Sequence, residues 1–157
     1  MVTDLFGTLL QELGPAIEAS ELHPDRNNSC LITLVSGIQI QLELDKSGQF
    51  LVLGCDLGPI QEQVKYRENL FREALKSNEQ PHPNHGLLAY SKKTDHLVLF
   101  EKINIRELTG DKIAAEITPF TEKAAVWSDA IKRGDVPMIS QGFTTGGRGP
   151  GMFGLRP

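Results

Sequence analysis

Three amphipathic helical segments and two groups of short strands alternate within the first 134 residues of this 157-residue chain. The order is one helix, three strands, a second helix, two strands and a third helix. Strands joined by short turns favour antiparallel pairing, and separate groups of strands and helices are typical of α+β domains. We therefore predict an α+β sandwich of order helix-β-β-β-helix-β-β-helix with a mainly antiparallel sheet. That arrangement leaves little sequence for a catalytic loop.

The third helix has the strongest periodicity in the chain. Its apolar residues recur at alternating four- and three-residue steps: Ile113, Ile117, Phe120, Ala124, Trp127 and Ile131. Such a narrow seam must pack against something long and flat, either the core sheet or a second helix in a dimer. Pro119 lies inside the pattern and lacks an N–H group, so we predict a kink or a fresh start near Thr118.

The other two helices are predicted from similar spacing, with a proline near each. The first spans about residues 4–19 and should break or kink at Gly14-Pro15. The second should open at residues 56–59, with Pro59 at its first position, and end near Ser77.

The clearest strand is residues 38–45, where apolar and polar side chains alternate strictly. Further strands are predicted at residues 30–36, 50–55, 86–90 and 96–103. Cys30 and Cys55 fall inside two of these strands and are expected to be free, buried thiols.

Composition and charge limit the classes of partner. The chain is 39% hydrophobic and carries 16 Lys and Arg against 20 Asp and Glu, for a net charge of −4. Nucleic acid and anionic membranes attract clustered positive charge, which this sequence lacks, so neither is expected as a partner. No signal peptide or long apolar span is evident, which favours a cytoplasmic location. Residues 135–157 are rich in glycine and proline, so we predict a mobile tail after a domain of residues 1–134.

Motifs for chemistry are missing. His82 and His85 are three residues apart but have no cysteine or acidic cluster beside them, so no metal site is predicted. His96 follows Asp95, which an ordinary hairpin turn explains. No nucleophile motif occurs, and we predict neither catalytic residues nor a cofactor.

A family resemblance emerges from the ordered set of elements. It rests on Leu5-Phe6 with Leu9-Leu10, the alternation of residues 38–44, the stretch Gly86-Leu87-Leu88-Ala89-Tyr90, and Phe120, Ala124 and Trp127. In this order and length, residues 2–134 resemble the class I type III secretion chaperones, the Tir chaperone family. The tail is longer than that family needs.

The resemblance implies a non-enzymatic, ATP-independent homodimer in a bacterial cytoplasm. It would hold the N-terminal segment of a secreted effector extended until secretion. By position, the implied effector contacts are Leu5, Leu9, Leu13, Ile32, Leu34, Leu97 and Leu99. The implied dimer contacts are Val64, Phe71, Leu75 and Leu88. Whether the tail contacts the effector, the secretion apparatus or nothing stays open.

Two alternatives remain at this point. A dimeric module of the same fold could bind a regulator in place of an effector. A small α+β enzyme could bring His96, Asp95 and another polar residue together in a closed pocket. A flat apolar groove would argue against the enzyme.

Overall fold

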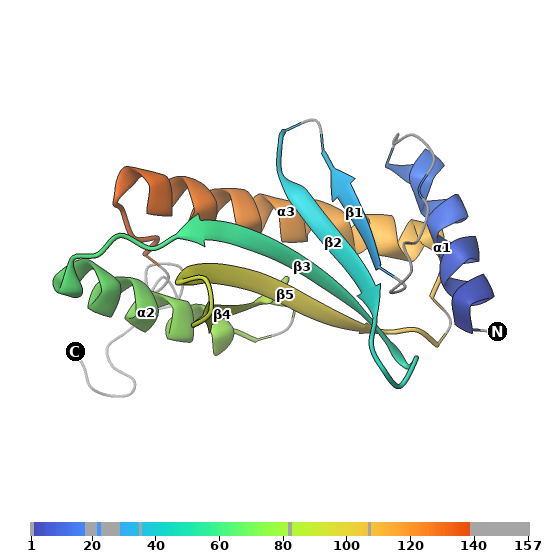
Figure 1. Cartoon of the computed structure of the whole chain (residues 1–157), viewed down its shortest axis with the longest axis horizontal. Coiled ribbons are helices and arrows are strands. Elements are labelled where there is room, and N and C mark those ends of the chain that lie inside the picture. Colours follow the sequence, from blue (N-terminus) through green and yellow to red (C-terminus); the bar gives the residue numbers. More distant parts are fainter. Residues whose placement is uncertain are drawn as a thin grey trace.

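The computed structural model describes residues 2–17, 22, 29–34, 36–81, 83–106 and 108–138, without the side chains of residues 2–5. Its elements follow the predicted order (Figure 1). They are α1 (Val2–Ala16), β1 (Ser29–Thr33), β2 (Gln39–Leu44), β3 (Phe50–Pro59), α2 (Val64–Asn78), β4 (Leu87–Ser91), β5 (His96–Asn104) and α3 (Gly110–Arg133). The predicted α+β class is confirmed.

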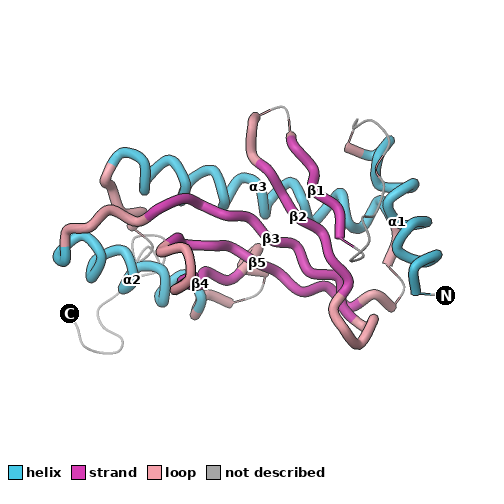
Figure 2. Tube along the Cα trace, in the orientation of Figure 1, coloured by secondary structure: helices cyan, strands magenta, loops and turns pink. Residues whose placement is uncertain are grey.

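The five strands form one antiparallel sheet of order β1-β2-β3-β5-β4. The first three strands make the predicted meander, and the β4–β5 hairpin adds to the free side of β3. Figure 2 shows α3 running along one face of the sheet, with α1 beside its first turns and α2 at the opposite end. Strands β1 and β4 are the two edges.

The core lies between α3, α1 and the covered face of the sheet. All six residues of the predicted seam are buried, and Trp127 and Phe120 are among the largest fully enclosed side chains. The inward residues of β2 and β3 complete this core: Ile40, Leu42, Leu44, Leu51, Leu53 and Leu57. The seam therefore packs within the chain, which was the simpler of its two predicted partners. Cys30 and Cys55 are buried, as predicted, and no disulfide joins them.

Pro119 does not break its helix as predicted, whereas α1 ends one residue after Pro15. Helix α3 continues through Pro119, so the expected restart near Thr118 does not occur. The seam residues on both sides of this proline are buried, and their packing outweighs one lost hydrogen bond. Pro15 lies in the last turn of α1, which ends at Ala16 and not near residue 19.

The predicted start of the second helix is wrong. Residues 56–59 belong to β3, which pairs with β5 as far as Pro59 across a bulge between Asp56 and Gly58. Gly58 has φ 106°, a value that favours glycine, and the Asp56 carboxylate accepts from its N–H. Helix α2 begins only at Val64, because long-range pairing with β5 overrides the local preference of this segment for a helix start.

Helix α2 and the segment that leads into it are hydrogen-bonded to the end of α3. The Gln61 side chain donates to the Ile131 carbonyl at 3.0 Å, and the Tyr66 hydroxyl donates to the Asp135 carbonyl at 2.9 Å. Its buried face carries Tyr66, Leu70 and Ala74.

The chain leaves α3 through Gly134, which caps the helix in the left-handed conformation at φ 77°. The predicted tail lies outside the described residues from position 139 onward. The domain boundary near residue 134 stays a prediction.

Candidate functional site

The outer edge of β4 is closed by side chains. The Asn78 amide donates to the Leu88 carbonyl at 2.9 Å and accepts from the Leu88 N–H at 2.8 Å, as a neighbouring strand would. The Lys123 ammonium donates to the carbonyls of Asn84 and Gly86 at 2.8 and 2.7 Å. This edge therefore offers few free backbone groups to a further strand.

The β1 edge is different. The Leu34 N–H donates to the Ile38 carbonyl, which fixes the side of the chain that faces β2. Because backbone groups alternate along a strand, those of Ile32 and Cys30 also face β2. The backbone groups of Leu31 and Thr33 therefore point outward. Among the described residues, no strand pairs with this outer side. The Leu31 side chain is 60% exposed. An exposed apolar side chain on an unpaired edge suits the addition of a strand from another chain.

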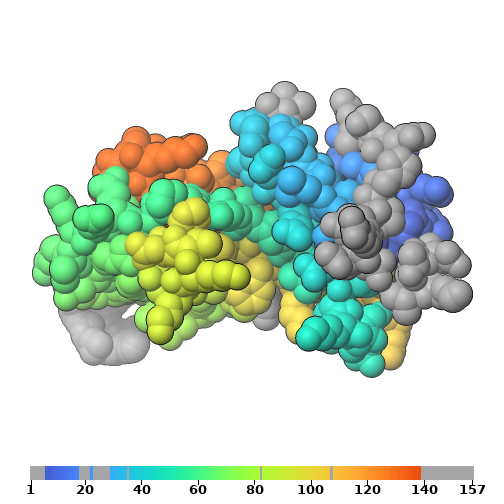
Figure 3. Space-filling model, viewed as in Figure 1, coloured from blue at the N-terminus to red at the C-terminus, as the bar shows by residue number. Residues whose placement is uncertain are grey.

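Two adjoining grooves run along α3. The larger, of about 600 Å³, lies between the β1–β2 hairpin, the second half of β3 and the C-terminal half of α3. The smaller, of about 470 Å³, continues toward the end of α1. The two share Ser36, Ile38 and Ala125. In Figure 3 the blue hairpin and the orange end of α3 flank a notch on this side of the molecule.

A third surface is an apolar stripe on α2. Val64 and Leu75 are 73% and 64% exposed, and with half-buried Phe71 they follow one face of the helix. The Phe71 ring meets the Tyr90 ring of β4 edge to face, with centroids 5.6 Å apart. This stripe contains three of the four predicted dimer contacts, whereas Leu88 is buried beneath it.

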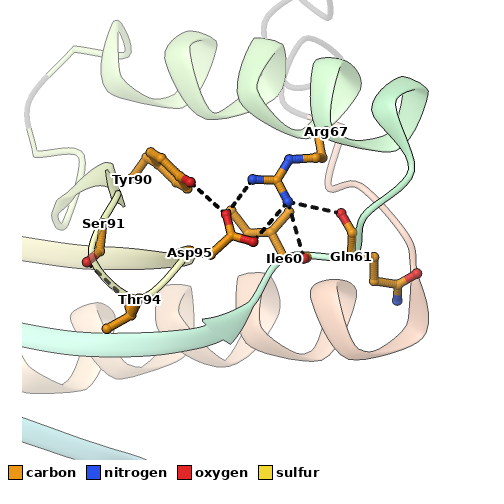
Figure 4. Close-up of polar contacts among 7 residues, drawn as sticks. All are labelled: Ile60, Gln61, Arg67, Tyr90, Ser91, Thr94 and Asp95. Atoms are coloured by element: carbon orange, nitrogen blue, oxygen red, sulfur yellow. Dashed lines mark hydrogen bonds and ion pairs between the residues drawn. The ribbon is translucent and has the colours of Figure 1, made fainter.

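An ion pair holds α2 to the β4–β5 turn beside this stripe (Figure 4). The Arg67 guanidinium donates to both carboxylate oxygens of Asp95, and the Tyr90 hydroxyl donates to the same carboxylate at 2.6 Å. Hydrogen bonds from Arg67 and Tyr90 lower the pKa of Asp95. The turn is thus a structural clamp that keeps Phe71 and Tyr90 in contact.

This clamp also separates the two residues of the candidate enzyme site. Asp95 is engaged by Arg67, while the His96 ring Nδ1 lies 2.8 Å from an exposed Asp56 carboxylate oxygen. Among the described residues, no group of three or more His, Cys, Asp or Glu side chains is placed to hold a metal ion. No described helix is long and apolar enough to cross a membrane.

The predicted effector contacts are divided by burial. Leu34 is half-buried, and the side chain of Leu5 lies outside the described part. The remaining five are at most 3% exposed: Leu9, Leu13, Ile32, Leu97 and Leu99. In the isolated chain these five are core residues, so their contact with an effector stays a prediction that would require the core to open. Leu31 and the two grooves were missed, although the outward position of Leu31 follows from the inward positions of Cys30 and Ile32.

One half-buried carboxyl group, that of Glu101, has an unusual ionisation. Glu101 on β5 faces Glu116 and Lys123 of α3, and its Oε1 has no hydrogen-bond partner among the described residues. Burial, and then the nearby Glu116 charge, raise the pKa of Glu101 to about 7. Burial lowers the pKa of Lys123, and the Lys123 charge partly opposes the rise in the Glu101 pKa.

This group makes folding depend on pH. The folded state keeps the Glu101 proton that the unfolded state releases above pH 4.5, so stability falls as pH rises from about 4.5 to 7. Glu101→Gln should raise the unfolding free energy at pH 8 by about 1–3 kcal/mol and leave it unchanged at pH 4. Urea unfolding at both pH values measures the difference. The exposed control Glu43→Gln should leave the unfolding free energy unchanged at both pH values. If the unfolding free energy of Glu101→Gln depended on pH as that of the wild type does, this assignment would be contradicted.

The sequence matches the model of the Tir chaperone protein (CesT) family over residues 8–128, well over half of the chain. The chain belongs to the Tir chaperone family. None of the curated proteins matches the sequence.

Solved structures share the fold of this Tir chaperone family member. The Yersinia pestis type III secretion chaperone SycH, in complex with a stable fragment of YscM2, is 20% identical with a TM-score of 0.63, covering 78% of this chain and 98% of that one. The ExsC–ExsE complex is 16% identical with a TM-score of 0.63, and the match covers 82% of this chain and 95% of that one. The HopA1–SchA chaperone–effector complex is 17% identical with a TM-score of 0.61, and the match covers 80% of this chain and 94% of that one. The TM-scores show a common fold, and at identities this low the likeness shows the fold alone.

Proposed function

We propose that this Tir chaperone family member binds the N-terminal segment of a secreted effector in the bacterial cytoplasm and keeps it extended without ATP. The observation that carries this proposal is the asymmetry of the sheet edges. Asn78 and Lys123 close β4, whereas β1 presents outward backbone groups and the exposed Leu31 side chain. An extended segment can add to such an edge and continue over the grooves beside α3.

A non-enzymatic role agrees with the polar groups of the surface. The His96–Asp56 pair is exposed, and Asp95 is engaged by Arg67 and Tyr90. Both grooves are open toward solvent and lined by small or apolar side chains over much of their length. These features suit a binding surface better than a closed catalytic pocket.

Affinity capture of the tagged, full-length chain from its own cells tests the proposal. We expect mass spectrometry to identify one or a few secreted proteins, held through their N-terminal segments and retained when ATP is added. Recovery of regulators alone would favour the regulatory-module alternative. Retention of only a small molecule would contradict the proposal.

We further propose that two copies of the chain pair through the apolar stripe of α2. Val64 and Leu75 expose more than half of their surface in the single chain, and such a stripe is typical of a helix with a partner. Leu75→Asp should therefore convert the dimer to a monomer without loss of helix content, because a carboxylate cannot remain unpaired in an apolar interface. Light scattering measures the mass. The control Val126→Asp, at a 55% exposed position of α3, should remain dimeric. A dimeric Leu75→Asp, or a monomeric wild type, would contradict this interface.

A further inference from the structure

The two halves of β3 have different neighbours. Residues Leu51–Gly54 pair with β2 on one side and β5 on the other, but Cys55–Pro59 pair only with β5. Figure 1 shows β3 running past the start of β2 while the β1–β2 hairpin diverges from it. The second half of β3 thus forms an additional strand edge inside the sheet, distinct from the outer edge of β1.

Backbone groups point into this gap. The Asp45 N–H donates to the Phe50 carbonyl at 3.0 Å, which fixes the side of β3 that faces β2. Alternation turns the N–H and C=O of Val52, Gly54 and Asp56 the same way. Gly54 is paired with Gln41, and Asp56 has no β2 partner in the described register. An unpaired strand position favours a strand as its occupant.

The α3 side chains beneath the gap determine how closely a bound strand can approach. In α3, Ala125 and Ser128 line the larger groove beside this half of β3, and Ala114, Thr118 and Thr121 line the smaller groove that continues from it. These side chains are small and follow one line along the helix beside the buried seam. Small side chains let another backbone approach closely. From Ala114 to Lys132 the helix extends roughly 27 Å, the length of about eight residues of strand.

The charged residues that line the grooves favour certain side chains in the bound segment. Among the described residues that line the two grooves, the charged ones are Asp56, Glu122 and Asp129 against Lys132. This acidic excess favours a segment that carries lysine or arginine and disfavours an acidic one.

We propose that the effector crosses the sheet at this gap, where a stretch of about eight extended residues with a basic side chain pairs with β3 at Asp56 and lies along the small residues of α3. This inference rests on the proposed function and names a second contact on the same surface. Binding at the gap and at the β1 edge together explains how one extended segment can be held over a long path, because linked contacts reinforce each other.

Filling the gap tests the proposal. The probe is the purified N-terminal segment of the secreted protein captured by the wild-type chain, labelled with a dye. Ala125→Leu should weaken its binding about tenfold or more, since a leucine occupies space that the segment needs. Ala115→Leu makes the same change on another face of α3 and should leave the affinity within about twofold. Fluorescence anisotropy measures both on the full-length chain, and equal affinities would overturn the proposal.

Two further measurements apply even where Ala125→Leu unfolds. Asp129→Lys alters an exposed position and should weaken the same probe about tenfold, whereas Glu79→Lys, an exposed control away from the gap, should not. The Asp56 amide should exchange its hydrogen at least about tenfold more slowly in the complex. Unchanged binding by Asp129→Lys together with unchanged Asp56 exchange would overturn the gap contact and leave the chaperone function standing. Failure to capture any secreted protein would overturn both.

Discussion

Gly110→Ala is expected to destabilise the protein by about 3 kcal/mol or more, although it adds a single methyl group. A Cβ at Gly110 would lie 2.6 Å from the carbonyl carbon of Glu12 and 2.7 Å from the backbone nitrogen of Leu13. These atoms belong to the backbone of α1, so they cannot rotate away as a side chain could. The Gly110 N–H also donates to Glu12 Oε1 at 2.8 Å, which fixes the close crossing of the two helices.

The matched control for this prediction is Gly7→Ala in α1. A Cβ at Gly7 has nothing within 4 Å, so alanine should fit and stabilise the helix by about 0.5–1 kcal/mol. Urea unfolding followed by circular dichroism measures both variants. A Gly110→Ala protein with the wild-type midpoint would show that α1 does not cross α3 at this glycine.

Leu9→Asp should abolish the fold and not merely the binding of a partner. Leu9 is 3% exposed in the core between α1 and α3. Removing its side chain alone costs about 2–5 kcal/mol, and an unpaired carboxylate at the same place adds more. We expect loss of the far-ultraviolet helical signal in buffer near neutral pH.

Leu31→Asp is the companion variant. Leu31 is 60% exposed, so its replacement should retain the wild-type unfolding midpoint and weaken effector binding at the β1 edge. A folded Leu9→Asp protein would contradict the burial of Leu9, and wild-type effector affinity in Leu31→Asp would contradict a role for the β1 edge.

Local periodicity made much of the fold predictable. The seam from Ile113 to Ile131 and the alternation of residues 38–44 each encode one buried face, and both faces are buried as predicted. The end of β3 could not be predicted, because residues 56–59 resemble a helix start and only pairing with β5 makes them a strand. The continuity of α3 through Pro119 could not be predicted for a similar reason, because packing on both sides of the proline keeps the helix intact.

The binding surface was less predictable than the fold. Leu9 and Leu31 are equally apolar, and only the three-dimensional arrangement shows that one is enclosed and the other exposed. The closure of β4 depends on Asn78 and Lys123, which approach that edge from two different helices. The gap beside β3 arises from the divergence of the β1–β2 hairpin, and no residue pattern marks it. By contrast, Val64, Phe71 and Leu75 were named beforehand as dimer contacts that the family resemblance implies, and their place in the dimer stays a proposal.

Hydrogen exchange on the complex with the captured secreted protein tests the central claim most directly. We expect slowed exchange in a continuous N-terminal segment of that protein and, on this chain, at Leu31, Thr33 and Asp56, with no change when ATP is added. Protection of a folded domain of the partner instead, or none on β1 and β3, would contradict the account.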